Sequence, residues 1–561
     1  MVKTKEKETV KKSASKVSIK KETKEVKKAP AAKKATTTKT PAKKSATKKA
    51  ATKTTAVKKT TTAKKVPAKK EPAKKVVAKK EVVTSKKKVL FVVSECQPFC
   101  ATGGLADVAG GLPRYIAKNK NMDIRVMMPL YSDIPTEYRE NFKYIGNKNI
   151  PLAWRSIYCG VFSYEKDNVT YYFLDNEYYF KRGNGIYSYF DDGERFAFTS
   201  KAVLEVLPLI DFTPDIIHCN DWQFALVPVY LKTEYNVKGL YNNIKTVFTC
   251  HNTEYQGRFD LRNTNDLFGI DTKNTSIVEY SGGLNLVKGA VVCCDKFTTV
   301  SPTYAKEILG PEHSNGLDSI LRQNSNKIVG ILNGVDYDFY NPQTDKVLYK
   351  NYDAKTYNLK KENKVALQKD LGLNVDETVP MLSIVTRMAK HKGLDLIKDG
   401  LEGIIANNNV QLIVAGNGTA EYENYFKYLE NKYKGKVKAC LGYSNKMARK
   451  AYAASDIFLM PSKSEPCGIS QMIASRYGSV PVVRETGGLK DSIKDFGCQE
   501  GGNGYTFANY NTHDLVYSIN RALKDYQDKA SWEEKIKICM NKDFSWNTSA
   551  IEYIKLYEEL V

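Results

Sequence analysis

Short apolar runs rich in β-branched residues recur along most of the chain, and each run ends in polar or glycine residues. Stretches of helical length, such as 196–207 and 421–433, separate many of these runs. This alternation is typical of doubly wound α/β domains built on parallel sheets. The predicted strands are 89–94, 124–128, 170–174, 215–219, 246–250, 296–300, 381–386, 411–415, 437–441, 456–460 and 480–483.

The predicted strands fall into two series, which a polar, Lys-rich stretch separates. About 470 residues follow the first 88, more than one hydrophobic core usually serves, so we expect two domains. The expected parts are a domain at 88–336, a connection at 337–379 with a helix at 363–373, a domain at 380–543 and a final helix at 544–561. The expected apolar positions of the final helix are Trp546, Ile551, Tyr553, Ile554 and Tyr557.

The first 88 residues differ in composition from the rest of the chain. They contain 32 Lys, 6 Glu, no Arg and no aromatic residue, so their net charge of +26 exceeds the +25 of the whole chain. Such a segment cannot bury enough apolar surface to offset its ordering entropy, so we predict that 1–87 is a disordered tail. It serves either as a solubilising extension or as a contact for a polyanion, with an affinity that falls steeply with salt. We expect polyanion contact in vitro.

One six-residue motif occurs twice, each time after a predicted strand. Thr102-Gly103-Gly104-Leu105-Ala106-Asp107 follows strand 89–94, and Thr486-Gly487-Gly488-Leu489-Lys490-Asp491 follows strand 480–483. A predicted helix at 111–118 comes after the first copy. A Gly-Gly pair between a strand and a helix exposes backbone N–H groups where the helix dipole favours an anion. One such turn in each domain predicts two nucleotide-binding halves that face one phosphorylated ligand.

Polar side chains follow two other predicted strands, at the edge where such sheets bind ligands. Asp221 follows strand 215–219 and His251 follows strand 246–250, so we expect a carboxylate and an imidazole close together. A structural role explains either residue alone, with Asp221 as a helix N-cap and His251 bonded to a loop carbonyl. The occurrence of both at neighbouring strand ends favours a site.

Charged side chains follow strands of the second series. Arg387 comes directly after strand 381–386 and Lys392 five residues later, a pair that suits a diphosphate. The alternative is two solvated surface cations, which the position of Arg387 at a strand end disfavours. Glu465 follows strand 456–460 and should begin a helix, where the dipole favours a carboxylate. Its functional role would be to accept hydrogen bonds from sugar hydroxyls.

Several motifs occur in one order along the chain. They are Ser94-Glu95 with Pro98-Phe99, the first Thr-Gly-Gly motif, His218 to Trp222, His251-Asn252, Val300 to Tyr304, Asn333 to Asp336, Arg387 with Lys392 to Asp395, Glu465 to Gly468, the second Thr-Gly-Gly motif and Phe544 to Trp546. Together they resemble bacterial glycogen synthases and plant starch synthases, the retaining glucosyltransferases that extend α-1,4-glucans. The resemblance covers about 88–561. It implies the GT-B fold, in which two Rossmann-like domains face a cleft and a C-terminal helix crosses back to the first domain.

The resemblance implies a site for ADP-glucose, which is a substrate, and implies no cofactor and no metal. The residues that it assigns to the donor phosphates are Gly103, Gly104, Thr486, Gly487 and Gly488. Arg387 and Lys392 would neutralise the departing diphosphate, where negative charge develops. Glu465 would hold the glucose hydroxyls, and Tyr187 matches a tyrosine of the donor pocket.

The resemblance also implies an α-1,4-glucan acceptor. His251 would lie against the reacting glucose, and Asp221 and Asp107 would shape the sugar and acceptor side. The departing phosphate helps to deprotonate the incoming 4-OH, so no pair of catalytic carboxylates is needed. Ile473, the eighth residue after Glu465, breaks the Glu-x7-Glu pattern of another retaining group, which counts against sucrose- or mannose-transferring relatives.

One position departs from the family pattern, because Ala101 stands where the family has a lysine. Loss of one charge-assisted contact typically costs roughly 1.5–3 kcal/mol, or about ten- to a hundredfold in affinity. We therefore expect an active glucosyltransferase with weaker donor binding or altered catalysis. Two alternatives stay open: a glucan-binding or tethering protein that has lost catalysis, and a GT-B transferase that uses UDP-glucose.

The sequence contains no apolar signal-peptide core and no run long enough to span a membrane. Its eleven cysteines are scattered without a CxxC, and its five histidines lack zinc-ligand spacing. We expect a cytoplasmic protein with reduced thiols.

Overall fold

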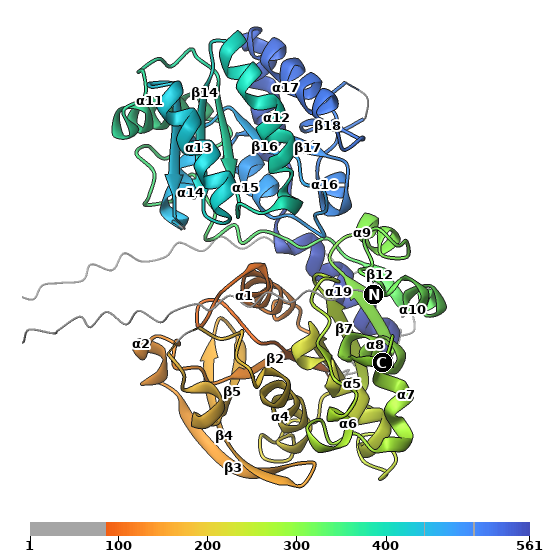
Figure 1. Ribbon diagram of the computed structural model, residues 1–561. Coiled ribbons are helices and arrows are strands. Elements are labelled where there is room, and N and C mark those ends of the chain that lie inside the picture. The colour runs from red at the N-terminus through yellow and green to blue at the C-terminus, as the bar shows by residue number, and fades with distance from the viewer. Residues whose placement is uncertain (1–85, 184, 443, 498–499) are drawn as a thin grey trace, which may run out of the picture. The chain divides into compact units, whose positions relative to one another are not determined.

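The structure is a computed structural model that describes residues 86–561 except 184, 443, 498 and 499 (Figure 1). The prediction of a disordered tail at 1–87 therefore falls almost wholly outside the described residues. Two large sheets and one small sheet organise the described part of the chain. No helix within that part is long and apolar enough to cross a membrane.

The first sheet has nine strands in the order β12-β11-β7-β6-β1-β2-β5-β4-β3. All neighbouring pairs from β12 to β5 are parallel, whereas β4 runs antiparallel to both β5 and β3. Its strands are β1 (Lys87–Val92), β2 (Met122–Pro129), β3 (Lys143–Leu152), β4 (Arg155–Lys166), β5 (Val169–Asp175), β6 (Ile216–Asn220), β7 (Lys245–Cys250), β11 (Lys296–Thr299) and β12 (Ile328–Gly330).

The prediction of a wholly parallel first sheet was wrong at the β3–β4 hairpin. Most β3 side chains are exposed or half-buried, and only Ile150 and Leu152 are buried. A strand at the edge of a sheet that faces water on one side carries no continuous apolar run, so the search for such runs missed it. Strand β4 also extends past the carboxyl end of β5, since Gly160 pairs with Asp175, the last residue of β5, and residues 155–159 continue beyond it.

Helices of the first part of the chain pack around this sheet. Helix α1 begins at Gly104 rather than at residue 111, because its buried face already starts at Leu105 and Ala106. These helices are α1 (Gly104–Ile116), α2 (Thr136–Arg139), α3 (Glu177–Phe180), α4 (Asp192–Glu205), α5 (Leu226–Tyr230), α6 (Asn263–Asp266), α7 (Thr275–Val278), α8 (Leu286–Cys293), α9 (Pro302–Glu307) and α10 (Asp318–Gln323). The small sheet consists of β8 (Arg258–Phe259), β9 (Glu279–Tyr280) and β10 (Gly283–Asn285).

The second sheet has six strands in the order β15-β14-β13-β16-β17-β18, and all its pairs are parallel, as predicted. The strand order reverses between β13 and β16, which is the switch point where such sheets bind ligands. Its strands are β13 (Met381–Val385), β14 (Gln411–Gly416), β15 (Val437–Leu441), β16 (Ile457–Met460), β17 (Val480–Arg484) and β18 (Tyr505–Phe507). The helices are α11 (Lys360–Leu371), α12 (Leu394–Asn407), α13 (Ala420–Lys432), α14 (Asn445–Ala454), α15 (Ser470–Arg476), α16 (Gly487–Ser492), α17 (Thr512–Tyr526) and α18 (Lys529–Asn541).

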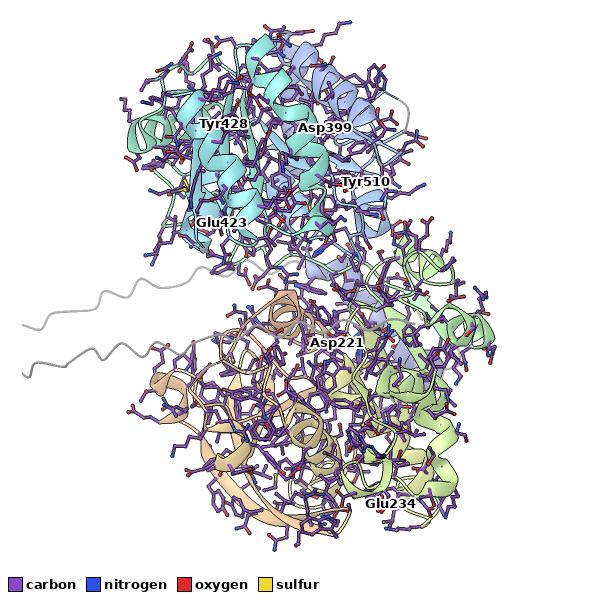
Figure 2. The ribbon with its side chains drawn as sticks, in the orientation of Figure 1. Asp221, Glu234, Asp399, Glu423, Tyr428 and Tyr510 are labelled. Atoms are coloured by element: carbon purple, nitrogen blue, oxygen red, sulfur yellow. The ribbon has the colours of Figure 1, made fainter. Side chains whose placement is uncertain are left out.

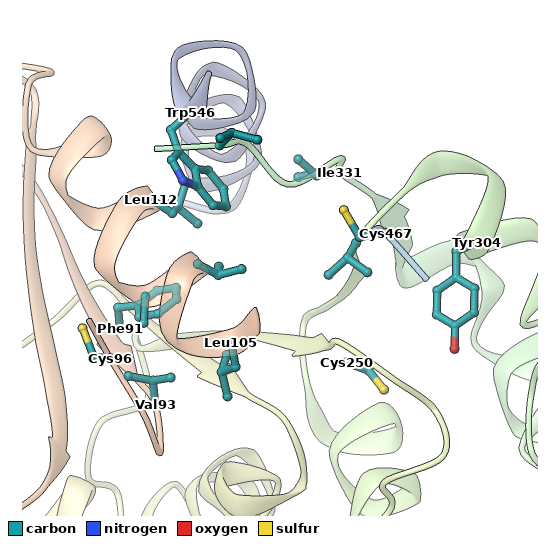
Figure 3. Close-up of a cluster of buried hydrophobic side chains, with 14 of the residues drawn as sticks. Phe91, Val93, Cys96, Leu105, Leu112, Cys250, Tyr304, Ile331, Cys467 and Trp546 are labelled. Atoms are coloured by element: carbon teal, nitrogen blue, oxygen red, sulfur yellow. The ribbon is translucent and has the colours of Figure 1, made fainter. Parts of the chain in front are cut away.

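The last helix, α19 (Trp546–Leu560), packs against α1 of the first sheet's domain. Trp546 lies over Leu112 in Figure 3, and a Cβ at Gly111 would come within 2.1 Å of the Trp546 indole nitrogen. The crossing back to the first domain that the resemblance implies is therefore present. The predicted apolar face was wrong at one position, because Ile551 is 53% exposed whereas Tyr553 and Tyr557 are buried.

Candidate active site

Three neighbouring strands of the first sheet end close to two predicted site residues and to a third residue, the acidic Glu95. β1, β6 and β7 lie side by side in the sheet, and their carboxyl ends lead to Glu95, Asp221 and His251 respectively. Because the three strands are parallel, these side chains come to one edge of the sheet. Asp221 is labelled at this edge in Figure 2.

Asp221 and His251 are in direct contact. The Asp221 carboxylate oxygen Oδ1 accepts a hydrogen bond from the backbone N–H of His251 at 2.8 Å. Asp221 adopts a left-handed conformation with φ 55°, which turns its side chain back toward β7, and it makes no N-cap hydrogen bond. Burial raises the pKa of the Asp221 carboxyl to about 7. The structural N-cap role considered for Asp221 is therefore not the one observed.

Asn220 orients the His251 imidazole. The Asn220 amide nitrogen donates to the Val92 carbonyl at 3.1 Å, which leaves its Oδ1 facing His251 Nε2 at 3.0 Å. Since Oδ1 only accepts, Nε2 carries the proton and Nδ1 is the free acceptor of a neutral ring. Burial lowers the pKa of His251 to about 4. This imidazole is therefore uncharged at neutral pH.

The first glycine turn is open to solvent. Thr102, Gly103 and Gly104 are exposed, and so is Ala101, the position of the family lysine. The buried Glu95 carboxylate accepts hydrogen bonds from Thr102 N–H at 2.5 Å, from the Thr102 hydroxyl at 2.8 Å and from Gly103 N–H at 3.1 Å. Glu95 thus fixes the first two residues of the turn, Thr102 and Gly103, and the exposed Gly104 begins α1.

Two further predicted residues lie near Glu95. The Tyr187 hydroxyl hydrogen-bonds the Ser94 hydroxyl at 2.7 Å, directly after β1. Asp107 lies in the first turn of α1, where burial and the neighbouring carboxylates of Glu95 and Asp336 raise its pKa to about 6. The structure therefore brings Asp107, Tyr187, Asp221 and His251 together around Glu95.

The second sheet contributes an ion pair between a half-buried lysine and a buried glutamate. Lys392 Nζ lies 2.7 Å from Glu465 Oε2, and Glu465 also accepts from the Ser462 hydroxyl at 3.1 Å. Lys392 follows β13 and Glu465 follows β16, the two strands of the switch point. Gly393, with φ 72°, allows the close approach, because a Cβ there would come within 2.0 Å of the Pro461 carbonyl.

Arg387 is exposed at the end of β13. It lies in the same electrostatic surroundings as the ion pair, because Lys392, Glu465 and Arg387 all act on the neighbouring His391. Burial and the adjacent cation Lys392 lower the pKa of His391, so this ring adds no positive charge at neutral pH. Glu254, three residues after His251, also acts on His391, which places the loop after β7 near the cations of the second sheet.

The second glycine turn is buried, unlike the first. Thr486, Gly487 and Gly488 are all buried, and their N–H groups have protein acceptors. Gly487 N–H and the Thr486 hydroxyl donate to the Glu307 carboxylate, at 3.0 and 3.2 Å to Oε1. Gly488 N–H donates to the carbonyls of Glu465 and Pro466, at 3.2 and 3.1 Å. Glu307 ends α9 of the first sheet's domain, so this turn forms part of a contact between the two sheets' domains.

Sequence reasoning assigned no role to four residues that shape this site: Glu95, Asn220, Glu307 and Ser462. Glu95 and Asn220 each lie within a motif that carries the resemblance, and Asn220 is directly beside the predicted residue Asp221, so their position was a signal. Glu307 had none, because it is 180 residues from its partner Gly487. Among the described residues, no group of three or more His, Cys, Asp or Glu side chains is arranged to hold a metal ion.

Comparison with known proteins decides the family. Residues 88–323 match the family described as "Starch synthase catalytic domain", and residues 368–538 match "Glycosyl transferases group 1". A glycogen synthase of Clostridium botulinum is 48% identical over 478 residues, covering 84% of this chain and 99% of that protein. The chain belongs to the glycogen synthase family. A second member, from Anoxybacillus flavithermus, is 46% identical over 477 residues.

Solved structures agree with this assignment. The catalytic domain of starch synthase IV from Arabidopsis thaliana, bound to ADP and acarbose, is 33% identical and superposes with a TM-score of 0.78 over 85% of this chain and 99% of that one. A sucrose-phosphate synthase from Thermosynechococcus elongatus, 15% identical with a TM-score of 0.53, shares the fold alone. The predicted GT-B fold of this family of glycosyltransferases is confirmed.

Proposed function

We propose that this chain transfers glucose from ADP-glucose to the non-reducing end of an α-1,4-glucan, with retention of configuration. The observation that carries the proposal is the ion pair of the half-buried Lys392 and the buried Glu465 at the switch point of the second sheet. A lysine and a carboxylate held together beside an exposed arginine, Arg387, provide positive charge for a diphosphate and an acceptor for sugar hydroxyls in one place. The ADP bound by the related starch synthase supports an adenine nucleotide as donor.

The proposed donor site combines the cations with the glycine turns. Arg387 and Lys392 neutralise the diphosphate as the bond to glucose breaks, and the Gly104 N–H at the start of α1 binds its phosphates from the open turn. The Gly103 N–H donates to Glu95 in this structure, so a phosphate that binds it requires the Glu95 carboxylate to withdraw. The proposed phosphate contacts also include the second turn, at Thr486, Gly487 and Gly488.

 In this structure Gly487 already donates to Glu307, so a phosphate that binds the second turn requires the Glu307 carboxylate to withdraw.

On the sugar side, we propose that His251 and Asp221 line the position of the transferred glucose. The Asp221 carboxylate holds the backbone of His251, and the neutral imidazole offers its free Nδ1 as an acceptor. Glu465 holds the glucose hydroxyls, Tyr187 lies at the donor pocket, and Asp107 faces the acceptor side. The departing diphosphate oxygen takes the proton of the incoming 4-OH while the new glycosidic bond forms on the same face that the phosphate leaves.

We further propose that no cofactor takes part, because glucosyl transfer is redox-neutral and the donor carries its own leaving group. The proposed domains are 88–336 and 380–543, joined by 337–379 and closed by the helix 544–561. A cytoplasmic location and polyanion contact through 1–87 remain proposals that rest on the sequence.

A glucan-binding or tethering protein is the second candidate, and the exposed Ala101 favours it. Without the lysine of the family at this position, the open glycine turn carries one positive charge fewer for the donor. The third candidate, a transferase that uses UDP-glucose, keeps the same site and differs only in the base that it binds.

The deciding experiment measures transfer of labelled glucose to glycogen by the purified chain, with ADP-glucose and UDP-glucose offered in parallel. We expect turnover with ADP-glucose and near-complete loss in Lys392→Ala and Glu465→Ala. Near-normal transfer by both variants would contradict the proposed site. Absence of transfer from either donor, together with binding to glycogen, would support the tethering protein instead.

A further inference from the structure

Trp154 is an exposed tryptophan at the turn between β3 and β4. Its exposed fraction is 76%, whereas Trp532 and Trp546 are almost fully buried and Trp222 is partly buried. A tryptophan that remains in water forgoes the large stabilisation that burial of its ring would provide. Single exposed apolar side chains are common on protein surfaces, so the inference rests on how this ring is held rather than on its exposure alone.

The exposed indole is held in one orientation. Its Nε1–H donates to Asp266 Oδ1 at 2.7 Å, and the Arg155 guanidinium lies over one face of the ring, 4.6 Å from its centre. Arg155 is itself held, because Nη1 donates to the Asp266 carbonyl at 2.6 Å and Nε lies 3.6 Å from Glu194. The N–H and one face of the ring are thus occupied, and the opposite face is presented to solvent.

The backbone beneath the ring is fixed as well. Ala153 has φ 54°, and the loop after α6 approaches it so closely that a Cβ at Gly269 would come within 2.9 Å of the Ala153 nitrogen. A rigid exposed ring loses little conformational entropy when a ligand covers it, which raises affinity. Such preorganisation is expected of a binding residue.

The surroundings of Trp154 fit a carbohydrate better than a protein. The core of a protein interface is depleted of Asp and Glu, although Trp and Arg are common there. Here one ring lies among the charged side chains of Arg155, Asp266 and Glu194. A pyranose ring presents an apolar C–H face for stacking and a rim of hydroxyls, and these charged groups supply donors and acceptors for that rim.

The β3–β4 turn lies on the side of the sheet where the proposed site is. Residues 155–159 of β4 continue past the carboxyl end of β5, and β5 is parallel to β2, β1 and β6. Arg155 also contacts Glu194 in the first turn of α4, which follows directly on the segment that contains Tyr187. Packed residues therefore connect the proposed donor pocket with the exposed ring.

We propose that Trp154 is a stacking platform for an α-1,4-glucan. The ring binds a part of the glucan that is remote from the non-reducing end in the proposed active site. This inference rests on the proposed function for the identity of the polymer. A second contact converts binding of a chain end at the active site into an intramolecular event and raises its effective concentration. Only long or branched acceptors reach both places, so the platform sets a preference for acceptor size.

The test compares Trp154→Ala with the full-length wild-type chain. We expect the KM for glycogen to rise about 3- to 10-fold, with kcat, the KM for ADP-glucose and the KM for maltotriose unchanged. Retardation of the protein in native gels that contain glycogen, a readout that needs no catalysis, should decrease in parallel. Trp154→Phe, which keeps an aromatic face, should restore most of both properties.

Tyr517→Ala provides the matched control. Tyr517 is a 61% exposed aromatic residue on α17 of the second sheet's domain, and its removal should change neither readout. If the wild type transfers glucose, and Trp154→Ala keeps the wild-type KM for glycogen and the wild-type gel retardation, the platform is overturned. The proposed function is then left intact. If the wild type transfers no glucose, loss of retardation in Trp154→Ala still supports the platform. A change of molecular mass in light scattering would assign the ring to contact with a second copy of the chain and would also overturn the proposal.

Discussion

The two copies of the Thr-Gly-Gly-Leu-x-Asp motif have nearly the same sequence and opposite environments. Thr102, Gly103 and Gly104 are exposed, and Glu95, the carboxylate that accepts from Thr102 and Gly103, comes from the same segment of chain. Thr486, Gly487 and Gly488 are buried, and their carboxylate, Glu307, comes from the domain of the other sheet. The first turn is open to solvent, and the second forms part of a contact between the two sheets' domains.

The motif aspartates differ in the same way. Asp107 faces the carboxylates of Glu95 and Asp336, which raise its pKa together with burial. Asp491 instead accepts hydrogen bonds from the Thr303 N–H and hydroxyl at the start of α9, at 2.7 and 2.6 Å. In both copies the repeated sequence leads from a strand into a helix, but the backbone differs, since Gly103 has φ −154° and precedes α1 whereas Gly487 has φ 44° and begins α16. The partner of each N–H and each carboxylate depends on which part of the chain packs against it.

The largest contrast is expected from one alanine in each turn. A Cβ at Gly488 would come within 2.1 Å of the Cys467 carbonyl, whereas a Cβ at Gly103 meets only Glu95, at 3.7 Å. Gly488→Ala should lower the free energy of unfolding by about 1–3 kcal/mol and, by displacing Glu465, lower kcat about a hundredfold. Gly103→Ala should change stability by less than about 0.5 kcal/mol. Thermal unfolding and transfer assays check both, and equal effects in the two variants would break the comparison.

A lysine at position 101 tests whether the first turn is a phosphate site. Ala101→Lys restores a cation beside the open N–H groups, so the KM for ADP-glucose should fall about ten- to a hundredfold. Ala101→Gln is the control, because it lengthens the side chain without adding a charge. Initial rates at varied donor concentration measure the effect. An unchanged KM in Ala101→Lys would show that the turn does not bind the diphosphate.

Removal of the charge at Glu307 tests whether the second turn also binds phosphate. In Glu307→Gln a neutral amide accepts the hydrogen bond from the Gly487 N–H more weakly than the carboxylate does. A donor phosphate therefore competes more easily for this N–H. We expect the KM for ADP-glucose to fall about 3-fold, which corresponds to less than about 1 kcal/mol. Glu312→Gln, an exposed carboxylate on the same loop, is the control. A KM that stays the same or rises would show that the donor does not displace Glu307 from Gly487.

The smallest effect concerns pH. The pKa of Asp107 is raised from 3.8 to about 6, so between these values the folded chain retains a proton that the unfolded chain has released. The resulting stabilisation is complete below about pH 3.8 and is lost as the pH rises through about 6. Between pH 4 and pH 6, Tm should therefore fall by about 2 °C less in Asp107→Asn than in the wild type. Asp399→Asn, at an exposed position, controls for the loss of charge, and parallel Tm profiles would refute the assignment.

Much of the fold was predictable because its strands are buried runs. Every strand of the second sheet except β18 was predicted to within about two residues, and β18 is only three residues long. The β3–β4 hairpin escaped prediction because its residues face water along an edge. In the same way, Ile551 looked like a core position from its apolar side chain, but it lies on the exposed side of α19.

The candidate site was also predictable only in part, because local sequence located its residues but not the contacts between them. Local sequence placed Asp221, His251, Arg387 and Lys392 at strand ends, and the order of motifs indicated the family. It did not show that Lys392 pairs with Glu465, 73 residues away, or that Asn220 sets the proton position of His251. These contacts require two strands to become neighbours in a sheet.

The sequence by itself determined the elements, the two glycine turns and the family, because burial of apolar runs and strand-end motifs are local properties. Only the tertiary structure decided which turn is open, which carboxylate accepts from it, and that Trp154 is held rigid at the surface. The physical reason is that a hydrogen bond or an exposed face depends on which distant segments approach, and no local pattern records that approach.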